Sequence, residues 1–170
     1  MNKKTLYLTK AALIAALYAV LTYIAAAAGL AYGEIQFRFS EALTILPLFC
    51  PAAIPGLTVG CLVSNIMSTV NPVDMVIGTL ATLLAALCTR ALRNVRIKNY
   101  PLLSMLMPVI FNGVFVGAEI AYFAGEGAFW PVFASAALSV AAGEAAVVLL
   151  LGTLLRSVIE RHEKLKTLLK

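Results

Sequence analysis

Residues 101–124 read PLLSMLMPVIFNGVFVGAEIAYFA, and this stretch decides the fold class. It is longer than the about 20 apolar residues that a membrane-spanning helix needs, and Glu119 is its single charged side chain. The whole chain has the same character, with 62% hydrophobic residues, 12% charged residues and a mean hydropathy of +0.95. Soluble domains are only about 45–50% apolar, so we expect an all-α integral membrane protein.

Turn signals divide the chain into apolar segments. The expected helices cover 9–31, 40–50, 54–70, 72–92, 101–124 and 130–155, and a charged tail covers 156–170. Pro47, Pro51 and Pro55 break the chain around the short second segment, and Pro108 is expected to kink the fifth or to end a first half-helix. Residues 32–39 alternate polar and apolar side chains, which is typical of an extended loop. We expect one domain, a six-transmembrane-helix bundle with an extended outer loop after the first helix.

The basic residues indicate the orientation of this bundle. Twelve of the thirteen Lys and Arg residues precede the first segment, follow the fourth or follow the sixth. Because basic residues accumulate on the cytoplasmic side of membrane proteins, both termini are expected in the cytoplasm. The exception, Arg38, lies in an outer loop near Glu34 and Glu41. The net charge of +5 is thus explained by topology, and no nucleic-acid partner is expected.

Four side chains of the fifth segment share one helical face. Asn112, Phe115, Glu119 and Tyr122 are spaced three, four and three residues apart. An ionised group at bilayer depth costs about 2.5–3.5 kcal/mol, so Glu119 needs a partner. Aromatic rings can stack on a planar heterocycle while an amide and a carboxylate bind its polar edge. We predict that this face binds a planar polar ligand; the alternative is a polar network between helices, for example from Glu119 to Arg38.

Other acidic and polar residues extend the candidate site. Glu144, on the last segment, is expected either to form the floor of the pocket or to be a protonated structural group. Glu34, Gln36 and Arg38 occupy alternate positions and would share one face of an extended chain. Together with Glu41 they are expected to form a lid over the ligand, unless they belong to an ordinary solvated loop whose charges pair with one another.

Three polar residues surround the turn between the third and fourth segments. We include Asn65 in the candidate binding site. Asn71 and Asp74 are explained at least as well by turn chemistry or helix capping as by contact with a ligand.

A stripe of alanines marks the first segment, where Ala11, Ala15 and Ala19 recur at every fourth residue. Small residues at this spacing let another helix approach closely, which is a main source of helix association in lipid. The stripe therefore indicates either a contact with a partner protein or packing inside the bundle.

Motifs of catalysis and of metal binding are absent from the sequence. It contains neither GxxxxGK[ST] nor GxSxG, and Cys50, Cys61 and Cys88 lie in apolar segments without metal-ligand spacing. We expect no catalytic residue, no metal site and no cofactor. If the chain moves its ligand across the membrane, the energy has to come from a partner or from an ion gradient.

Four blocks of sequence resemble one known family. They are GEIQFRFSEAL at 33–43, PAAIPGL at 51–57, GTLATL at 78–83 and PVIFNG at 108–113, and the similarity covers nearly the whole chain. These blocks resemble the QueT family, which consists of substrate-binding S components of energy-coupling factor (ECF) transporters. ECF transporters are ABC importers, and this family is linked to uptake of queuosine precursors, which are deazaguanine bases.

The resemblance implies a six-helix S component in the bacterial plasma membrane. It implies that the chain captures its substrate from outside and docks on a membrane coupling subunit that carries two ATPase subunits. It further implies that Ala11, Ala15 and Ala19 form the docking surface and that the loop after the first segment closes over the ligand. The N–H donors of a guanine-like edge would face Glu119 or Glu144, since charge-assisted hydrogen bonds contribute about 1.5–3 kcal/mol each.

Three alternative functions remain open. One is an S component for another vitamin-like heterocycle. Another is an ion-coupled secondary transporter that uses Glu119 or Glu144 as its coupling site. The third is a structural membrane subunit without a ligand.

Overall fold

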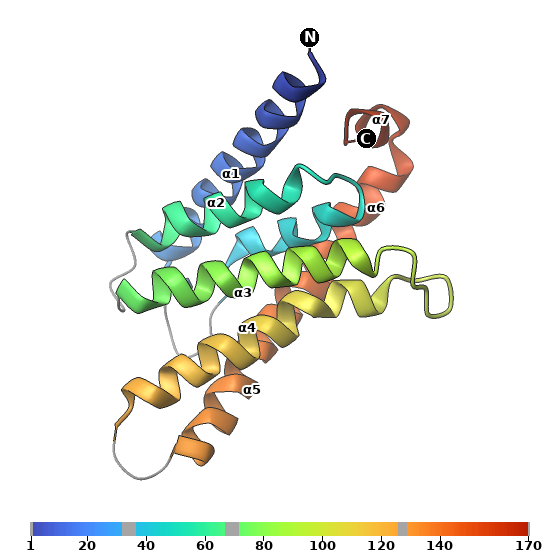
Figure 1. Ribbon diagram of the computed structural model, residues 1–170. Helices are drawn as coiled ribbons and strands as arrows, with labels where there is room; N and C mark the ends of the chain where they lie inside the picture. The colour runs from blue at the N-terminus through green and yellow to red at the C-terminus, as the bar shows by residue number, and fades with distance from the viewer. Residues whose placement is uncertain (1, 32–36, 67–71, 126–128, 170) are drawn as a thin grey trace.

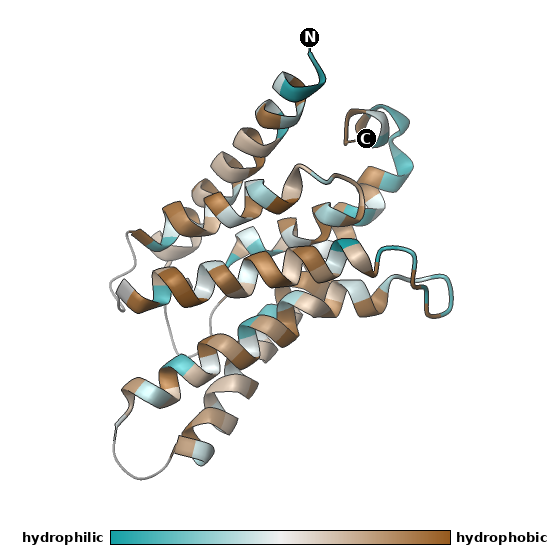
Figure 2. Ribbon diagram, viewed as in Figure 1, coloured by the Kyte–Doolittle hydropathy of each residue, from teal (hydrophilic) through white to brown (hydrophobic). Residues whose placement is uncertain are grey.

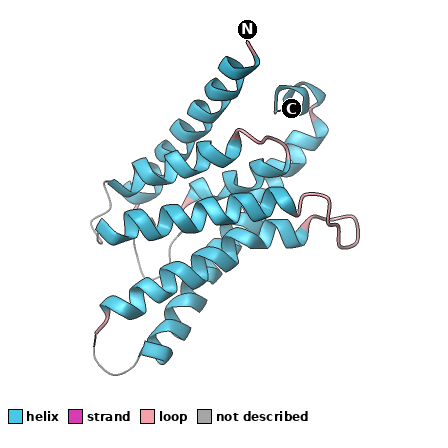
Figure 3. Ribbon diagram, viewed as in Figure 1, coloured by secondary structure: helices cyan, strands magenta, loops and turns pink. Residues whose placement is uncertain are grey.

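The computed structural model describes residues 2–31, 37–66, 72–125 and 129–169, and helices joined by loops make up this part of the chain (Figure 3). The elements are α1 (Lys3–Ala27), the 3₁₀ helix η1 (Phe39–Leu48), α2 (Ala53–Ile66), α3 (Pro72–Ala91), α4 (Leu102–Phe123), α5 (Phe129–Val147), the short π-helix η2 (Val148–Gly152), α6 (Thr153–Arg161) and α7 (Glu163–Leu169). α5, η2 and α6 continue one another as a single helix, Phe129–Arg161. The predicted all-helical fold class is confirmed.

Successive helices run in alternating directions, and both termini lie at the same end of the bundle (Figure 1). Four helices are long and apolar enough to cross a membrane, namely α1, α3, α4 and the continuous helix from α5 to α6. η1 and α2 are apolar but shorter. A hydrocarbon core about 30 Å thick needs about 20 α-helical residues. The structure therefore supports four spanning helices, and the count of six stays a prediction.

Hydrophobic residues occur along all the long helices (Figure 2), and many of their large side chains are exposed on the outside of the bundle. Leu17, Val20 and Ile24 on α1 are exposed, as are Leu80 and Leu87 on α3. Apolar surface in water costs about 25 cal/mol per Å², whereas lipid chains solvate it without that cost. Five charged side chains are buried among the described residues, namely Arg38, Glu41, Asp74, Glu119 and Glu144. The bundle therefore has a largely apolar outside and a partly polar interior.

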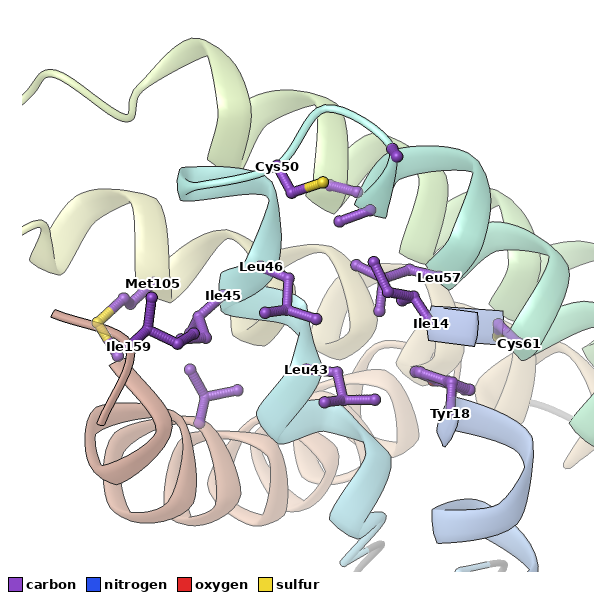
Figure 4. Packing of buried hydrophobic residues seen from close by; sticks show 14 residues of the cluster. Ile14, Tyr18, Leu43, Ile45, Leu46, Cys50, Leu57, Cys61, Met105 and Ile159 are labelled. Carbon is purple, nitrogen blue, oxygen red and sulfur yellow. The ribbon is translucent and has the colours of Figure 1, made fainter. Parts of the chain in front are cut away.

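The 3₁₀ helix η1 is the central element of the bundle. Residues 40–47 are all buried, and η1 contacts α1, α2, α3, α4, α5, η2 and α6. A 3₁₀ helix rises about 2.0 Å per residue against about 1.5 Å for an α-helix, so the ten residues of η1 extend further through the interior. Figure 4 shows Ile45 of η1 pointing toward Met105 and Ile159. One end of η1 is thus held in an apolar core, and the other carries Ser40 and Glu41.

Glycines allow two pairs of helices to approach closely. A Cβ atom added at Gly60 of α2 would lie 2.7 Å from Tyr18 Cβ and 2.9 Å from the Ala15 carbonyl oxygen on α1. A Cβ atom added at Gly117 of α4 would lie 2.8 Å from Ala137 Cα on α5. Small residues at such crossings permit the backbone contact that stabilises helix pairs in lipid. They fix the α1–α2 and α4–α5 walls of the interior.

Three expectations are corrected or limited by these elements. α4 runs without interruption through Pro108, so the predicted end of a half-helix at this proline is wrong. The final membrane helix continues to Arg161 instead of ending near 155, which places residues 156–161 in helix and not in a separate tail. Of the expected extended loop 32–39, residues 32–36 lie outside the described residues, while Arg38 has an extended backbone.

Candidate functional site

The candidate site begins at the polar end of η1, against one face of α1. Tyr18 and Thr22, four residues apart on α1, are both fully buried. The Tyr18 hydroxyl donates a hydrogen bond to Glu41 Oε1, and the Thr22 hydroxyl donates to Ser40 Oγ at 2.8 Å. These contacts hold one oxygen of Glu41 and leave its Oε2 without a hydrogen-bond donor among the described residues.

Arg38 connects the end of α1 to α2 and α3. Its Nε donates to the Ala31 carbonyl oxygen at 3.2 Å, and its Nη1 donates to Asn65 Oδ1 at 3.4 Å. Its Nη2 lies 4.0 Å from Asp74 Oδ2 in an ion pair. Arg38, Asn65 and Asp74 are all buried. The alternative of a solvated loop is therefore wrong for Arg38, and Asp74 is a buried ion-pair partner in addition to lying in the first turn of α3.

Asn112 and Glu144 face each other between α4 and α5. The Asn112 side-chain amide donates to Glu144 Oε1, and both residues are buried. η1 contacts both α4 and α5, so this pair lies on elements that border η1. Glu144 Oε2 has no donor within the described chain. Glu144 thus contacts the α4 face through Asn112, and its role as the floor of a pocket stays a prediction.

Glu119 is one of the residues that line an apolar groove between α3 and α4. The groove has a volume of about 440 Å³ and is otherwise lined by Val73, Ile77, Val114, Phe115, Ala118, Tyr122 and Phe123. Glu119 is only 6% exposed, and neither of its carboxylate oxygens meets a donor from the described residues. Val73, next to Asp74 in the first turn of α3, also lines the groove, so the groove lies close to the Arg38–Asp74 ion pair.

The structure separates the predicted α4 face into two parts. Phe115, Glu119 and Tyr122 line the groove, whereas Asn112 contacts Glu144 in the interior. Tyr122 is 74% exposed, so it lies at the rim and not in an enclosed pocket. Glu119 joins the two parts, since it is buried like Asn112 and lines the groove like Phe115.

Donors and acceptors in this interior do not balance. Four buried carboxylate oxygens have no donor among the described residues, namely Glu41 Oε2, Glu144 Oε2 and both oxygens of Glu119. A buried acceptor left unsatisfied costs about 1–3 kcal/mol, and more when it is charged. A ligand that presents several N–H groups would satisfy these oxygens. The described residues contain no cluster of three or more His, Cys, Asp or Glu that could hold a metal ion.

The remaining predicted residues, from the loop and the alanine stripe, are not part of these contacts. Glu34 and Gln36 are outside the described residues. Ala11 and Ala15 face α2, where Gly56 and Gly60 approach their carbonyl oxygens, and Ala19 is buried. The stripe is therefore used at least in part for packing inside the bundle, the alternative that the sequence left open.

Sequence reasoning missed Tyr18, Thr22 and Ser40. The available signal was the spacing of Tyr18 and Thr22, which puts two hydroxyl groups on one face of an otherwise apolar helix. Ser40 directly precedes Glu41, but its bond to Thr22 depends on how η1 packs on α1.

Comparison with known proteins gives a family match and one curated relative. The family model described as QueT transporter matches residues 8–161. The queuosine precursor transporter QueT of Lactococcus lactis subsp. cremoris is 40% identical over 82 residues, which are 48% of this chain and 48% of that protein. The alignment thus spans about half the length of the curated relative. No solved structure matches the chain.

Proposed function

The chain belongs to the QueT transporter family, and from that premise we propose that it is the substrate-binding S component of an ECF importer, capturing a queuosine precursor from outside the cell. As a member of a transporter family it is a membrane transport protein and not an enzyme. The relative named as a queuosine precursor transporter supports the choice of a deazaguanine base as substrate.

The proposed topology places the site at the outer side of the bacterial plasma membrane. All six apolar helices, including the shorter η1 and α2, cross the bundle, with both termini in the cytoplasm. Asp74 lies in the first turn of α3, and Glu119 lies near the last turn of α4. These helix ends lie opposite the chain termini (Figure 1). A solute arriving from outside therefore meets the Arg38, Asp74 and Glu119 end of the interior first.

The single observation that carries the proposal is the set of buried carboxylate oxygens without donors. The edge of a guanine-like base presents adjacent N–H groups. Glu41 and Glu144 each offer one carboxylate oxygen without a donor from the described residues, and these oxygens can accept from the N–H groups. Charge-assisted hydrogen bonds contribute about 1.5–3 kcal/mol each, so two of them supply much of the affinity of a small ligand.

Partner subunits supply the energy in this proposal. The sequence has no nucleotide-binding motif, and in this proposal two ATPase subunits hydrolyse ATP while a membrane coupling subunit connects them to this chain. We place the docking surface on the face of α1 that contains the half-buried Ala11 and Ala15 and the exposed Ala12 and Ala16 beside them. Ala19 is buried and belongs to the edge of this face that packs inward.

Ligand binding by the purified full chain tests the proposed substrate. We expect a deazaguanine to be found by mass spectrometry of the small molecules that co-purify, and added deazaguanines to bind in calorimetry with one site per chain. A matched panel of vitamins should not bind. If no deazaguanine binds while a vitamin does, the chain is an S component for another heterocycle.

Uptake into proteoliposomes tests the energy source. We expect uptake only when the coupling subunit, both ATPases and ATP are present. Uptake by this chain alone, driven by a pH gradient, would show that the chain is an ion-coupled transporter that uses Glu119 or Glu144, and not an S component.

A further inference from the structure

The turn between α3 and α4, residues 92–100, carries charge and apolar surface that the proposed function does not use. Its sequence is LRNVRIKNY, with three basic residues and no acidic one. In Figure 1 it extends beyond the ends of both helices. Topology explains why Lys and Arg gather on this side of the membrane, but it does not require exposed apolar residues between them.

Backbone and side-chain contacts hold this turn in one conformation. Ile97 and Tyr100 exchange two backbone hydrogen bonds, of 2.8 and 2.9 Å, around Lys98 and Asn99. The two central residues have φ angles of 50° and 65°, in the left-handed region that residues other than glycine seldom adopt. Tyr100 is also tied to the last membrane helix, because its hydroxyl lies 2.6 Å from Thr153 Oγ1. The side chains of the turn are therefore presented in a fixed arrangement.

Exposed apolar and exposed basic side chains alternate along the turn. Val95 and Ile97 are 41% and 49% exposed. Arg96 and Lys98 are exposed as well, and neither forms an ion pair with the described residues. Residues 75–118 contain no Asp or Glu, so the chain brings no negative charge of its own to this stretch. A surface of this composition suits a partner that offers hydrocarbon and negative charge together.

The surface continues the lipid-facing outside of α3. Leu80 and Leu87 are exposed on that helix, which ends at Ala91, and the turn follows directly. The turn thus lies where α3 leaves the hydrocarbon, at the depth of the lipid headgroups. Acyl chains and phosphate groups adjoin each other at this depth, and basic segments beside a membrane helix attract anionic lipid. A protein partner with an acidic face would have to displace lipid from the apolar side chains first.

We propose that residues 92–100 form a binding surface for anionic phospholipid in the cytoplasmic leaflet. Val95 and Ile97 contact the ends of the acyl chains nearest the headgroups, while Arg96 and Lys98 bind the headgroup phosphates. The inference uses the proposed topology and is independent of the choice of substrate.

Native mass spectrometry of the full chain tests the inference, after release from nanodiscs made of equal parts of phosphatidylcholine and phosphatidylglycerol. We expect the chain to retain phosphatidylglycerol over phosphatidylcholine by at least about tenfold, since each Lys or Arg near an anionic surface favours binding by about fivefold. In the double variant Arg96→Gln/Lys98→Gln this preference should fall to about threefold or less.

Two further variants separate the charges from their apolar neighbours. Val95→Ser/Ile97→Ser keeps both charges and should retain less of both lipids, by about threefold, because apolar contact is lost. Lys3→Gln/Lys4→Gln is the matched control, since it removes the same charge from exposed positions on α1. This control should leave the lipid preference of the wild-type chain unchanged.

Three results would contradict the inference. Equal retention of the two lipids by the wild-type chain overturns it, and this comparison needs no variant to fold. A preference that Lys3→Gln/Lys4→Gln lowers as much as Arg96→Gln/Lys98→Gln shows a general attraction of charge and overturns the assignment to the turn. Lipid retention unchanged in Val95→Ser/Ile97→Ser overturns the contact with acyl chains. None of these results bears on the deazaguanine substrate, which the calorimetry tests separately.

Discussion

The two ends of η1 face opposite kinds of surroundings. At one end, Ile45 and Leu46 pack in a hydrocarbon core together with Met105 and Ile159. At the other end, Glu41 meets Tyr18 and keeps one oxygen without a donor from the described chain. The same buried helix thus combines a stabilising half with a half that holds unsatisfied acceptors, which is the usual relation between a scaffold and a binding site.

The difference predicts that stability and binding can be changed separately. Substitutions in the apolar half should lower the free energy of unfolding and leave the contacts of the ligand in place. Substitutions in the polar half should weaken ligand binding and leave the free energy of unfolding unchanged or raised. The reason is that replacing a buried charge is often neutral or stabilising for the fold.

The largest effect is expected in the apolar half, from Leu46→Ala. Leu46 is 6% exposed, and its loss leaves a cavity that should lower the free energy of unfolding by about 2–5 kcal/mol. The matched control is Leu17→Ala on α1, where Leu17 is 46% exposed and faces outward, with an expected change within about 0.5 kcal/mol. Denaturant titration in detergent micelles measures both. Equal losses would show that the apolar half is no more tightly packed than the outer surface.

A smaller effect, of opposite kind, is expected from Glu41→Gln in the polar half. Affinity for a deazaguanine should fall by about 10-fold to 100-fold, since one charge-assisted hydrogen bond is lost. The unfolding transition should stay or move to higher denaturant, because a buried charge is removed. Calorimetry and the same denaturant titration measure the two quantities. A loss of stability comparable to that of Leu46→Ala, with affinity retained, would remove the distinction between the halves.

The smallest effect is expected from Tyr18→Phe, which removes one hydroxyl and keeps the ring. Glu41 loses the donor that positions it, so affinity should fall by about threefold to tenfold, with about 1 kcal/mol lost from stability. Thr9→Val on the same helix, at an exposed position whose hydroxyl donates to the Thr5 carbonyl oxygen, is the control. An affinity unchanged by Tyr18→Phe would mean that Glu41 is placed by η1 alone.

Much of the fold followed from hydropathy, because a long apolar run such as 101–124 has few alternatives to a membrane helix. The site carboxylates on α4 and α5 could also be predicted, since Glu119 and Glu144 stand out as charges within apolar segments. The partners of the buried charged residues were harder to predict. Asp74 could be taken for a capping residue, and its ion pair with Arg38 appears only when α3 packs beside the start of η1.

The remaining features depend on packing between helices. η1 is a 3₁₀ helix that contacts α1 to α6 and η2, and no local signal in its sequence distinguishes it from a short α-helix. The alanine stripe has a spacing that suits any close contact, and only Gly56 and Gly60 reveal that α2 uses part of it. Tyr122 shares a helical face with Glu119, yet its side chain is exposed while that of Glu119 is buried, a difference that depends on which neighbouring helices cover each turn of α4.

The contacts of η1 also constrain how the protein is made. η1 is the second helix to leave the ribosome, but its neighbours include α5, η2 and α6, which are synthesised last. Until then Glu41 lacks its final surroundings, and η1 is too short to be a stable span in lipid by itself. Assembly in the membrane therefore finishes only when the last helix is inserted, and a chain truncated before Phe129 should be recognised by membrane quality control as unfinished and degraded.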